Sequence, residues 1–132
     1  MGMDYTVQAR GAFDEVVAAV EQATAGAGFK VQFVHDVAAT LAEKGFTRER
    51  VTIIEICNAK YASKVLAADV KIGLMLPCPI MVYAEGDAVF ISTMRPTLIG
   101  SFFPDAHIEE VAAEVEAVIV QVIDRAAAVA TR

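Results

Sequence analysis

The chain has 132 residues, of which 56% are hydrophobic, and its 11 basic and 17 acidic residues give a formal net charge of −6. This length predicts one domain over residues 1–132, and the lack of a basic run argues against nucleic acid and anionic membrane surfaces as partners. Because it has no run of about 18 apolar residues, no signal-peptide pattern and only two cysteines, we expect a cytoplasmic protein with free thiols.

The N-terminal part of the chain predicts a strand followed by a helix. Along residues 3–9, apolar and polar side chains alternate, and this period of two residues is typical of a strand. From residue 13 to residue 23, apolar residues recur at helical spacing. Asp14 and Glu15 stand in the first turn of this helix, where the helix dipole favours acidic side chains. Glycines at positions 26 and 28 predict its end.

The next segment predicts a second strand and a short helix. Residues 29–35 form the strand, with three apolar side chains expected on one face: Phe29, Val31 and Phe33. Asp36 is placed to cap a helix over residues 37–44, because its carboxylate can accept hydrogen bonds from the free N–H groups of the first turn. Gly45 then ends this helix.

The middle of the chain predicts a strand that is apolar on both faces. Residues 51–57 contain four branched aliphatic side chains at successive and alternate positions, which indicates a central strand or one covered on both sides. Asn58 is a favourable N-cap, and the alanine-rich residues 59–68 form the helix that it starts. This places Cys57 between the end of a strand and the start of a helix.

The last third predicts a hairpin and a long helix. Residues 80–84 and 88–93 are strands joined by a Gly86 turn. We interpret residues 95–103 as a loop. The final helix is expected to open at Pro104 and Asp105 with His107 in its first turn, and to run for about six turns or roughly 35 Å. Its wide apolar stripe is expected to face the core and, on another side, a partner.

The order of these elements is β-α-β-α-β-α-β-β-α. Helices between strands favour parallel pairing, but the closing hairpin requires an antiparallel pair. We therefore predict an α+β fold, a single domain in which helices pack on one face of a mixed or mostly antiparallel sheet. The high apolar content also favours extra burial in an oligomer.

Cys57 and Cys78 are the most informative candidate site residues. A thiol beside a helix N-terminus can have a lowered pKa and act as a nucleophile, although free cysteines more often pack as small buried hydrophobes. Cys78 stands between Pro77 and Pro79, on an extended segment. The proline isomers stay open, and the 20 residues between the cysteines do not establish whether the two thiols meet.

Two charged residues complete the candidate site. Glu55 lies inside an apolar strand, so it must be paired, lie at an edge or have a shifted pKa. Arg95 follows the last strand and could hold an anionic ligand. The histidines His35 and His107 and the cysteines are not spaced like zinc ligands, so we predict no metal. No cofactor motif and no catalytic triad is visible, and the sequence does not indicate an enzyme.

Several of these pieces occur together in a known family. Ile54-Glu55-Ile56-Cys57-Asn58, the alanine-rich helix, Leu76-Pro77-Cys78 and the Val82-Tyr83 strand resemble the bacterial and archaeal family catalogued as domain of unknown function 302. The resemblance covers nearly the whole chain, including the long last helix. It implies a TATA-binding-protein-like topology, in which helices pack against a curved, mostly antiparallel sheet, and it implies a homodimer. It does not imply DNA binding.

The chain departs from the family pattern at two positions. Ala59 stands where a proline usually follows Cys-Asn, and Pro79 stands where an arginine usually follows Leu-Pro-Cys. If the family site uses that arginine to hold an anion, Arg95 would have to replace it here.

The combined hypothesis is a dimeric binding or accessory module. Its pocket is expected to take a small molecule or a reactive sulfur species, and the candidate ligand-binding residues are Cys57, Asn58, Cys78, Glu55 and Arg95. One alternative is a thiol-dependent redox protein with Cys57 as nucleophile and Cys78 as resolving thiol. Another is a purely structural assembly module.

Overall fold

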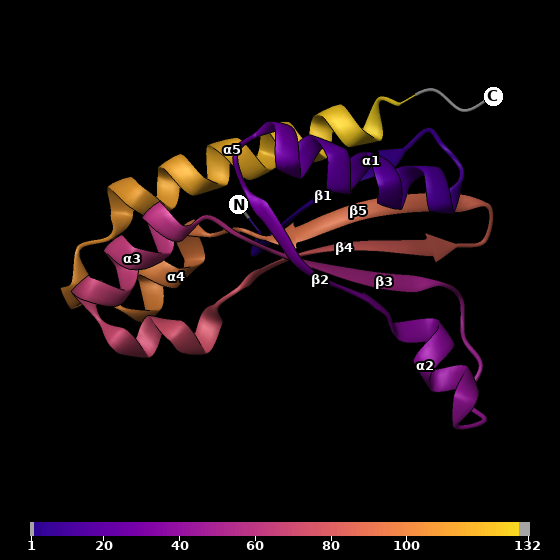
Figure 1. The fold of residues 1–132 in the computed structure, drawn as a ribbon, viewed down its shortest axis with the longest axis horizontal. Helices are drawn as coiled ribbons and strands as arrows, with labels where there is room; N and C mark the ends of the chain where they lie inside the picture. The colour runs from indigo at the N-terminus through magenta and orange to yellow at the C-terminus, as the bar shows by residue number, and fades with distance from the viewer. Residues whose placement is uncertain (1, 130–132) are drawn as a thin grey trace.

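Five strands form one antiparallel sheet in the order β1-β5-β4-β3-β2, and the computed structural model describes residues 2–129 of the protein (Figure 1). The strands are β1 (Asp4–Ala9), β2 (Lys30–Asp36), β3 (Val51–Cys57), β4 (Cys78–Glu85) and β5 (Ala88–Met94). All neighbouring pairs are antiparallel, so the predicted α+β class is confirmed and the sheet contains no parallel pair. The helices between strands are crossovers that return the chain.

The helices occupy three places around this sheet. The helices α1 (Phe13–Gly26) and α5 (Glu109–Ala127) cover one face, which we call the helix-covered face (Figure 1). On the other side of the sheet, α2 (Val37–Glu43) projects beyond β2 and β3. A group of four short elements gathers at one end of the sheet: α3 (Ala59–Ala68), η1 (Val70–Met75), α4 (Thr97–Phe102) and η2 (Pro104–Ala106). We call these four elements the end lobe.

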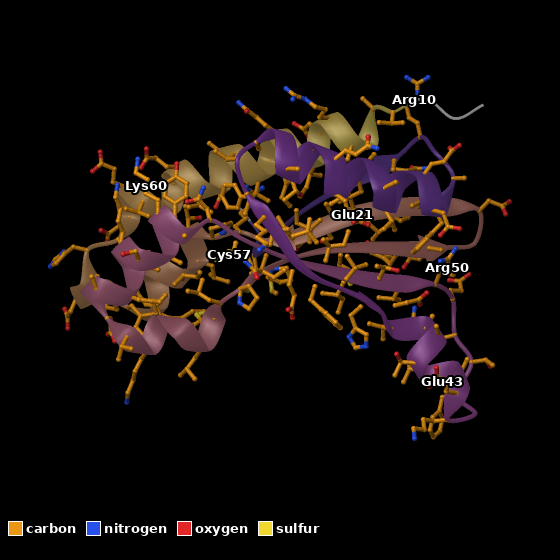
Figure 2. The ribbon with its side chains drawn as sticks, viewed as in Figure 1. Arg10, Glu21, Glu43, Arg50, Cys57 and Lys60 are labelled. Carbon is orange, nitrogen blue, oxygen red and sulfur yellow. The ribbon has the colours of Figure 1, made fainter. Side chains whose placement is uncertain are left out.

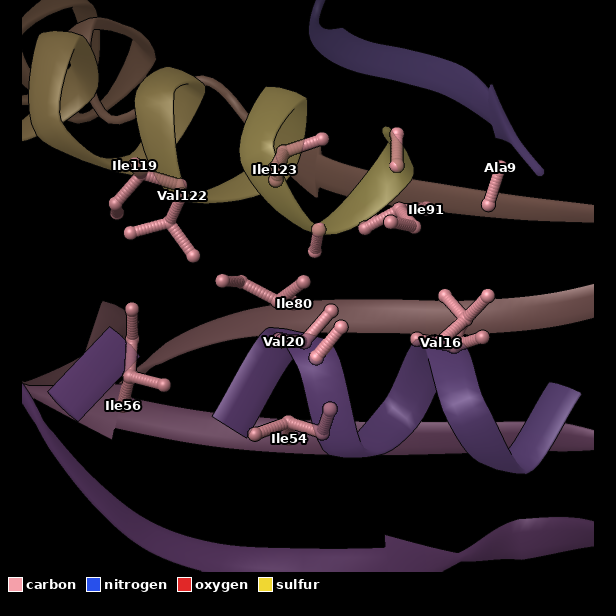
Figure 3. Close-up of a cluster of buried hydrophobic side chains, with 14 of the residues drawn as sticks. Ala9, Val16, Val20, Ile54, Ile56, Ile80, Ile91, Ile119, Val122 and Ile123 are labelled. Carbon is pink, nitrogen blue, oxygen red and sulfur yellow. The ribbon is translucent and has the colours of Figure 1, made fainter. Parts of the chain in front are cut away.

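Two clusters of buried apolar side chains hold the fold together. The larger one lies between the sheet and the two covering helices, where aliphatic side chains from all three interlock (Figure 3): Val16 and Val20 from α1, Ile54, Ile56, Ile80 and Ile91 from the sheet, and Ile119 and Ile123 from α5. The smaller cluster lies where the end lobe meets the start of α5, and its buried members are Ile72, Ile99 and Ile108. Each fully buried aliphatic side chain contributes about 1.5–3 kcal/mol of transfer free energy.

Local signals for caps and turns are confirmed. The Asp36 carboxylate accepts a hydrogen bond from the Ala39 N–H at 3.0 Å. The β4–β5 hairpin turns at Gly86, whose φ of 60° lies in the left-handed region that glycine tolerates. These features depend on neighbouring residues alone, which explains why the pattern of the sequence was sufficient to predict them.

The prediction that Phe29, Val31 and Phe33 share one face was wrong. A register shift between Val31 and Phe33 marks a β-bulge in β2. Because an extra residue reverses the alternation of side chains, Val31 packs against the main core whereas Phe33 is 56% exposed. Phe33 therefore faces the side of the sheet that α1 and α5 leave uncovered.

Residues 95–106 also differ from the prediction. The segment interpreted as a loop contains α4, and Pro104 opens η2 rather than the long helix. His107 has a left-handed φ of 55° and separates η2 from α5, which begins at Glu109. The long helix has 19 residues, which at a rise of 1.5 Å per residue is about 28 Å. Its outward side carries mostly polar or small exposed residues, including Glu110, Glu114 and Gln121.

Candidate functional site

A pocket opens at the junction of the sheet and the end lobe, between the two apolar clusters. Phe29, Ile56 and Val115 of the main cluster line one side, and all three members of the smaller cluster line the other: Ile72, Ile99 and Ile108. Figure 2 shows Cys57 at this junction, where the strands meet α3. The pocket thus exists because the protein has two cores with an incompletely filled boundary between them.

The pocket is narrow. Its cavity volume is about 40 Å³. Small-molecule sites usually enclose about 300–1,000 Å³. The shape therefore fits a slender group, and a bulkier ligand would require the end lobe to move.

The structure brings Cys57 and Cys78 to the same pocket. Cys78 is paired with Ile56 in the β3–β4 register, so its side chain is directed to the helix-covered face and packs against the main core. Cys57 follows Ile56 as the last residue of β3 and also lines the pocket. Both cysteines are free thiols. The peptide bond between Leu76 and Pro77 is cis.

The Cys78 thiol is held in its neutral form. Burial raises its pKa from 9.0 to about 11, and the nearby Cys57 adds to the rise. A group with this pKa has about a hundredth of the thiolate that an ordinary cysteine has at neutral pH. Because the thiolate is the nucleophile, the Cys78 side chain behaves as an apolar wall of the pocket.

The raised pKa predicts a loss of stability in alkali. Below pH 9 the thiol is neutral in both the folded and the unfolded chain, so it contributes its full stabilisation there. Between pH 9 and 11 the unfolded thiol ionises while the folded one resists, and by about pH 10.5 the free energy of unfolding should fall by about 2 kcal/mol. Urea denaturation across this range measures the effect.

Cys78→Ala is the control, because it removes the titrating group from the same wall. The other groups that ionise in alkali remain in both proteins, so only the difference between the two curves reports on Cys78. If the free energies of unfolding of the two proteins fall in parallel from pH 8 to 10.5, the Cys78 thiol is not held neutral by burial.

Asn58 lines the pocket but is occupied with structural hydrogen bonds. Its side-chain oxygen accepts from the Tyr61 N–H at 3.2 Å, which caps α3 as predicted. Its amide nitrogen donates to the Gly28 carbonyl at 3.1 Å. Because both ends of the amide are used, Asn58 holds α3 against the start of β2 and offers little to a ligand.

Glu55 and Arg95, the two charged residues expected at the site, do not line this pocket. Glu55 stands between Ile54 and Ile56, which are fully buried in the main core, so it lies on the other face of the sheet. Arg95 donates to the Glu116 carboxylate at 3.1 Å and lies over the Tyr5 ring at 5.4 Å from its centroid. Arg95 therefore does not replace an anion-binding residue at Pro79.

Glu116 is the centre of a polar cluster at the start of α4. Its carboxylate accepts hydrogen bonds from Arg95 and from both the N–H and the hydroxyl of Thr97. Burial alone would raise the pKa of Glu116, but these hydrogen bonds and the Arg95 charge outweigh it and lower the pKa. The cluster ties α5 to the chain between β5 and α4, and so fixes one side of the end lobe.

Sequence reasoning missed most of the pocket wall. Tyr61 and Val65 of α3, Ile72 of η1 and Ile99 of α4 all line it, and the Tyr61 ring stacks on Phe29 with centroids 6.0 Å apart. The available signal was the apolar content of residues 97–103, which is unusual for a surface loop. The segment is too short to show a recognisable helical period in its sequence.

The residues that the structure describes contain no cluster of three or more histidine, cysteine or acidic side chains able to hold a metal ion. Over the same residues, every helix is too short or too polar to cross a bilayer.

Comparison with known proteins places the chain in a family. A crystal structure described as an uncharacterized conserved protein DUF302 from Bacillus stearothermophilus has a TM-score of 0.90 and 29% sequence identity, and the match covers 96% of this chain and 99% of that chain. No curated protein matches the sequence. The model of the family described as "Domain of unknown function DUF302" matches residues 5–126. The chain belongs to the DUF302 family.

Proposed function

We propose that the protein is a binding module whose pocket takes a small, uncharged apolar molecule or the slender apolar part of a larger one. The observation that carries this proposal is the chemistry of the pocket wall, which is almost wholly aliphatic and aromatic. Small-molecule sites are usually lined mainly by apolar and aromatic side chains with a few polar groups, and the lining of this pocket matches that composition.

The electrostatics of the wall favour an uncharged ligand. Among the described residues, no lysine or arginine lines the pocket, and Arg95, which follows β5, is paired with Glu116. A buried anion without a cation or hydrogen-bond donors costs several kcal/mol in desolvation. An anionic sulfur species therefore fits the wall less well than a neutral ligand.

The thiol-redox alternative is disfavoured by the same wall. A resolving cysteine must ionise in order to attack, and the raised pKa of Cys78 opposes ionisation at neutral pH. The cysteines are better explained as soft, weakly polar parts of an apolar surface.

A pair of probes that differ only in charge tests this proposal. 1-Hexanol and hexanoate have the same chain length, and binding can be followed by the methyl NMR signals of Ile56, Ile72 and Ile108 at pH 7.4. We expect 1-hexanol to shift these signals saturably and to bind at least about tenfold more tightly than hexanoate, a difference of about 1.4 kcal/mol. Equal or tighter binding of hexanoate would contradict an uncharged-ligand site.

A matched pair of variants locates the binding. Ala62 lines the pocket from α3, and Ala67 is exposed on the same helix. Ala62→Leu should fill the pocket and weaken 1-hexanol binding at least about tenfold, whereas Ala67→Leu should leave it unchanged, because alanine and leucine have similar helix propensities. Equal affinity in the two variants would show that 1-hexanol binds elsewhere. Native mass spectrometry of the purified protein would then identify any retained natural ligand.

A further inference from the structure

The sheet has a second face, on the side away from α1 and α5, which we call the open face. Its apolar centre consists of five partly exposed side chains on the strands β2 to β5: Phe33, Ile53, Met81, Tyr83 and Phe90. The register places Ile53 opposite Met81. Tyr83 stands opposite Phe90, and their rings stack with centroids 5.3 Å apart. Figure 1 shows no helix of the described chain lying across this face, and contiguous exposed apolar patches usually mark a contact surface.

Carboxylates surround this apolar centre. Because side chains alternate along a strand, Glu55 is the next residue after Ile53 on the same face of β3. By the same alternation, Glu85 follows Tyr83 on β4, and Asp4 stands on the edge strand β1. Within the described part of the chain, none of the three carboxylates forms an ion pair.

Little positive charge balances these carboxylates. Among the residues that the described strands direct to the open face, Lys30 is the only lysine or arginine, and it stands at one end, opposite Cys57. The negative charge acts on the apolar centre itself. Burial raises the pKa of Tyr83, and the charges of Glu85 and Asp4 raise it further. The open face is therefore both apolar and negatively charged.

The helix α2 provides a second, independent observation. None of its seven residues is buried in the described chain, although short helices in proteins are normally stabilised by packing. It projects on the same side of the sheet as the open face (Figure 1), and just beyond it the Phe46 side chain is 67% exposed. A partner on the open face would therefore also have α2 and Phe46 to pack against.

The chemistry of the open face indicates the kind of partner that fits it. An apolar stripe bordered by lysine or arginine matches an apolar centre bordered by carboxylates, because complementary potentials favour association. Aromatic rings such as those of Tyr83 and Phe90 also attract cations. The opposite face of the same sheet packs two amphipathic helices, α1 and α5, so a helix is a shape that this sheet accommodates.

The same charges disfavour other occupants. Nucleic acids and anionic lipid surfaces carry phosphates, which the carboxylates repel. A second copy of the chain would bring Asp4, Glu55 and Glu85 of both copies into one interface. Like charges that face each other across an interface suppress association.

From these observations we propose that the open face binds a basic amphipathic helix of another protein. The apolar stripe of that helix packs on the apolar centre, and its lysine or arginine side chains pair with Asp4, Glu55 and Glu85. The proposal does not depend on what the pocket binds, because none of the residues that define the open face lines the pocket.

A pair of model peptides tests the charge preference. Both are amphipathic helices of about 18 residues, or about 27 Å, with leucine on one side and either lysine or glutamate on the other. Fluorescence anisotropy near neutral pH should show that the lysine peptide binds at least about tenfold more tightly than the glutamate peptide, and that added salt weakens its binding. Equal or tighter binding of the glutamate peptide would contradict the proposal.

Two double variants with the same change in net charge locate the binding. Glu55→Gln with Glu85→Gln removes two carboxylates from the open face, whereas Glu110→Gln with Glu114→Gln removes two from the outward side of α5. The first pair should weaken binding of the lysine peptide at least about tenfold, and the second less than about twofold. Equal weakening would show that the net charge of −6, rather than this face, attracts the peptide.

The apolar centre is tested by a second matched pair. Phe33→Ser should weaken binding of the lysine peptide at least about fivefold, whereas Leu74→Ser should leave it unchanged, because Leu74 is 83% exposed but lies in η1. Phe33 is 56% exposed, so circular dichroism should show an unchanged fold in both variants. The pocket variant Ala62→Leu should also bind the peptide as wild type does, which separates this surface from the ligand site.

Two further results would overturn the proposal. One is equal affinity of Phe33→Ser and Leu74→Ser for the lysine peptide, which would place the peptide on another surface. The other is a wild-type dimer, seen by sedimentation velocity without peptide, that Phe33→Ser dissociates, because the open face would then be covered by a second copy.

Discussion

Replacing Ile72 with alanine should lower the free energy of unfolding by about 3 kcal/mol, because it removes a fully buried side chain from a small core. Ile72 has no exposed surface and belongs with the buried Ile99 and Ile108 to the smaller cluster, on which four partly buried side chains also pack: Val65, Met75, Phe103 and Ala106. Alanine at this position leaves a cavity that the surrounding side chains fill only in part. Urea denaturation of the wild-type and variant proteins measures the difference.

Leu74→Ala is the control for this prediction. Leu74 lies two residues further along η1 and is 83% exposed, so its truncation should change the stability by less than about 0.5 kcal/mol. The pair separates the burial of a side chain from the shortening of an aliphatic residue in η1. Similar losses in both variants would mean that the end lobe is not organised around Ile72.

Glu116→Gln is expected to cost about 3 kcal/mol of stability, because it leaves the Arg95 guanidinium unpaired in a largely buried position. The side chains of Arg95 and Glu116 are 20% and 17% exposed. The amide of glutamine has only one accepting oxygen, so it cannot keep all the hydrogen bonds that the carboxylate accepts from Arg95 and Thr97. Glu114→Gln, at an exposed position on the same helix, provides the control and should have little effect.

The pH dependence gives Glu116→Gln a second readout. Since folding lowers the pKa of Glu116, its stabilisation is present above the pKa of the unfolded carboxyl group and is lost as the pH falls through the folded value. The difference in stability between wild type and Glu116→Gln should therefore be large at pH 7 and shrink in acid. A difference that stays constant from pH 7 down to about pH 3 would show that the carboxylate charge is not what stabilises the fold.

The two cysteines show how far the candidate site could be predicted. The position of Cys57 between a strand and the Asn58 cap was readable from adjacent residues, and the cap is confirmed. That Cys78 lies at the same pocket depends on the β3–β4 pairing, in which it stands opposite Ile56. Its raised pKa depends on burial by residues from distant parts of the chain. Neither the pairing nor the burial is recorded in the neighbouring sequence.

The sequence by itself determined the features that have local causes. These are the strands with alternating or continuous apolar patterns, the Asp36 and Asn58 caps, the Gly86 hairpin and the long closing helix. Only the tertiary structure decided the features that arise where distant segments meet. The bulge in β2 reversed the direction of Phe33, and packing on α5 gave helical structure to a segment near Ile99 that is too short to show a period. The pocket is the clearest case, because it is lined by members of two buried apolar clusters that are built from distant segments of the chain.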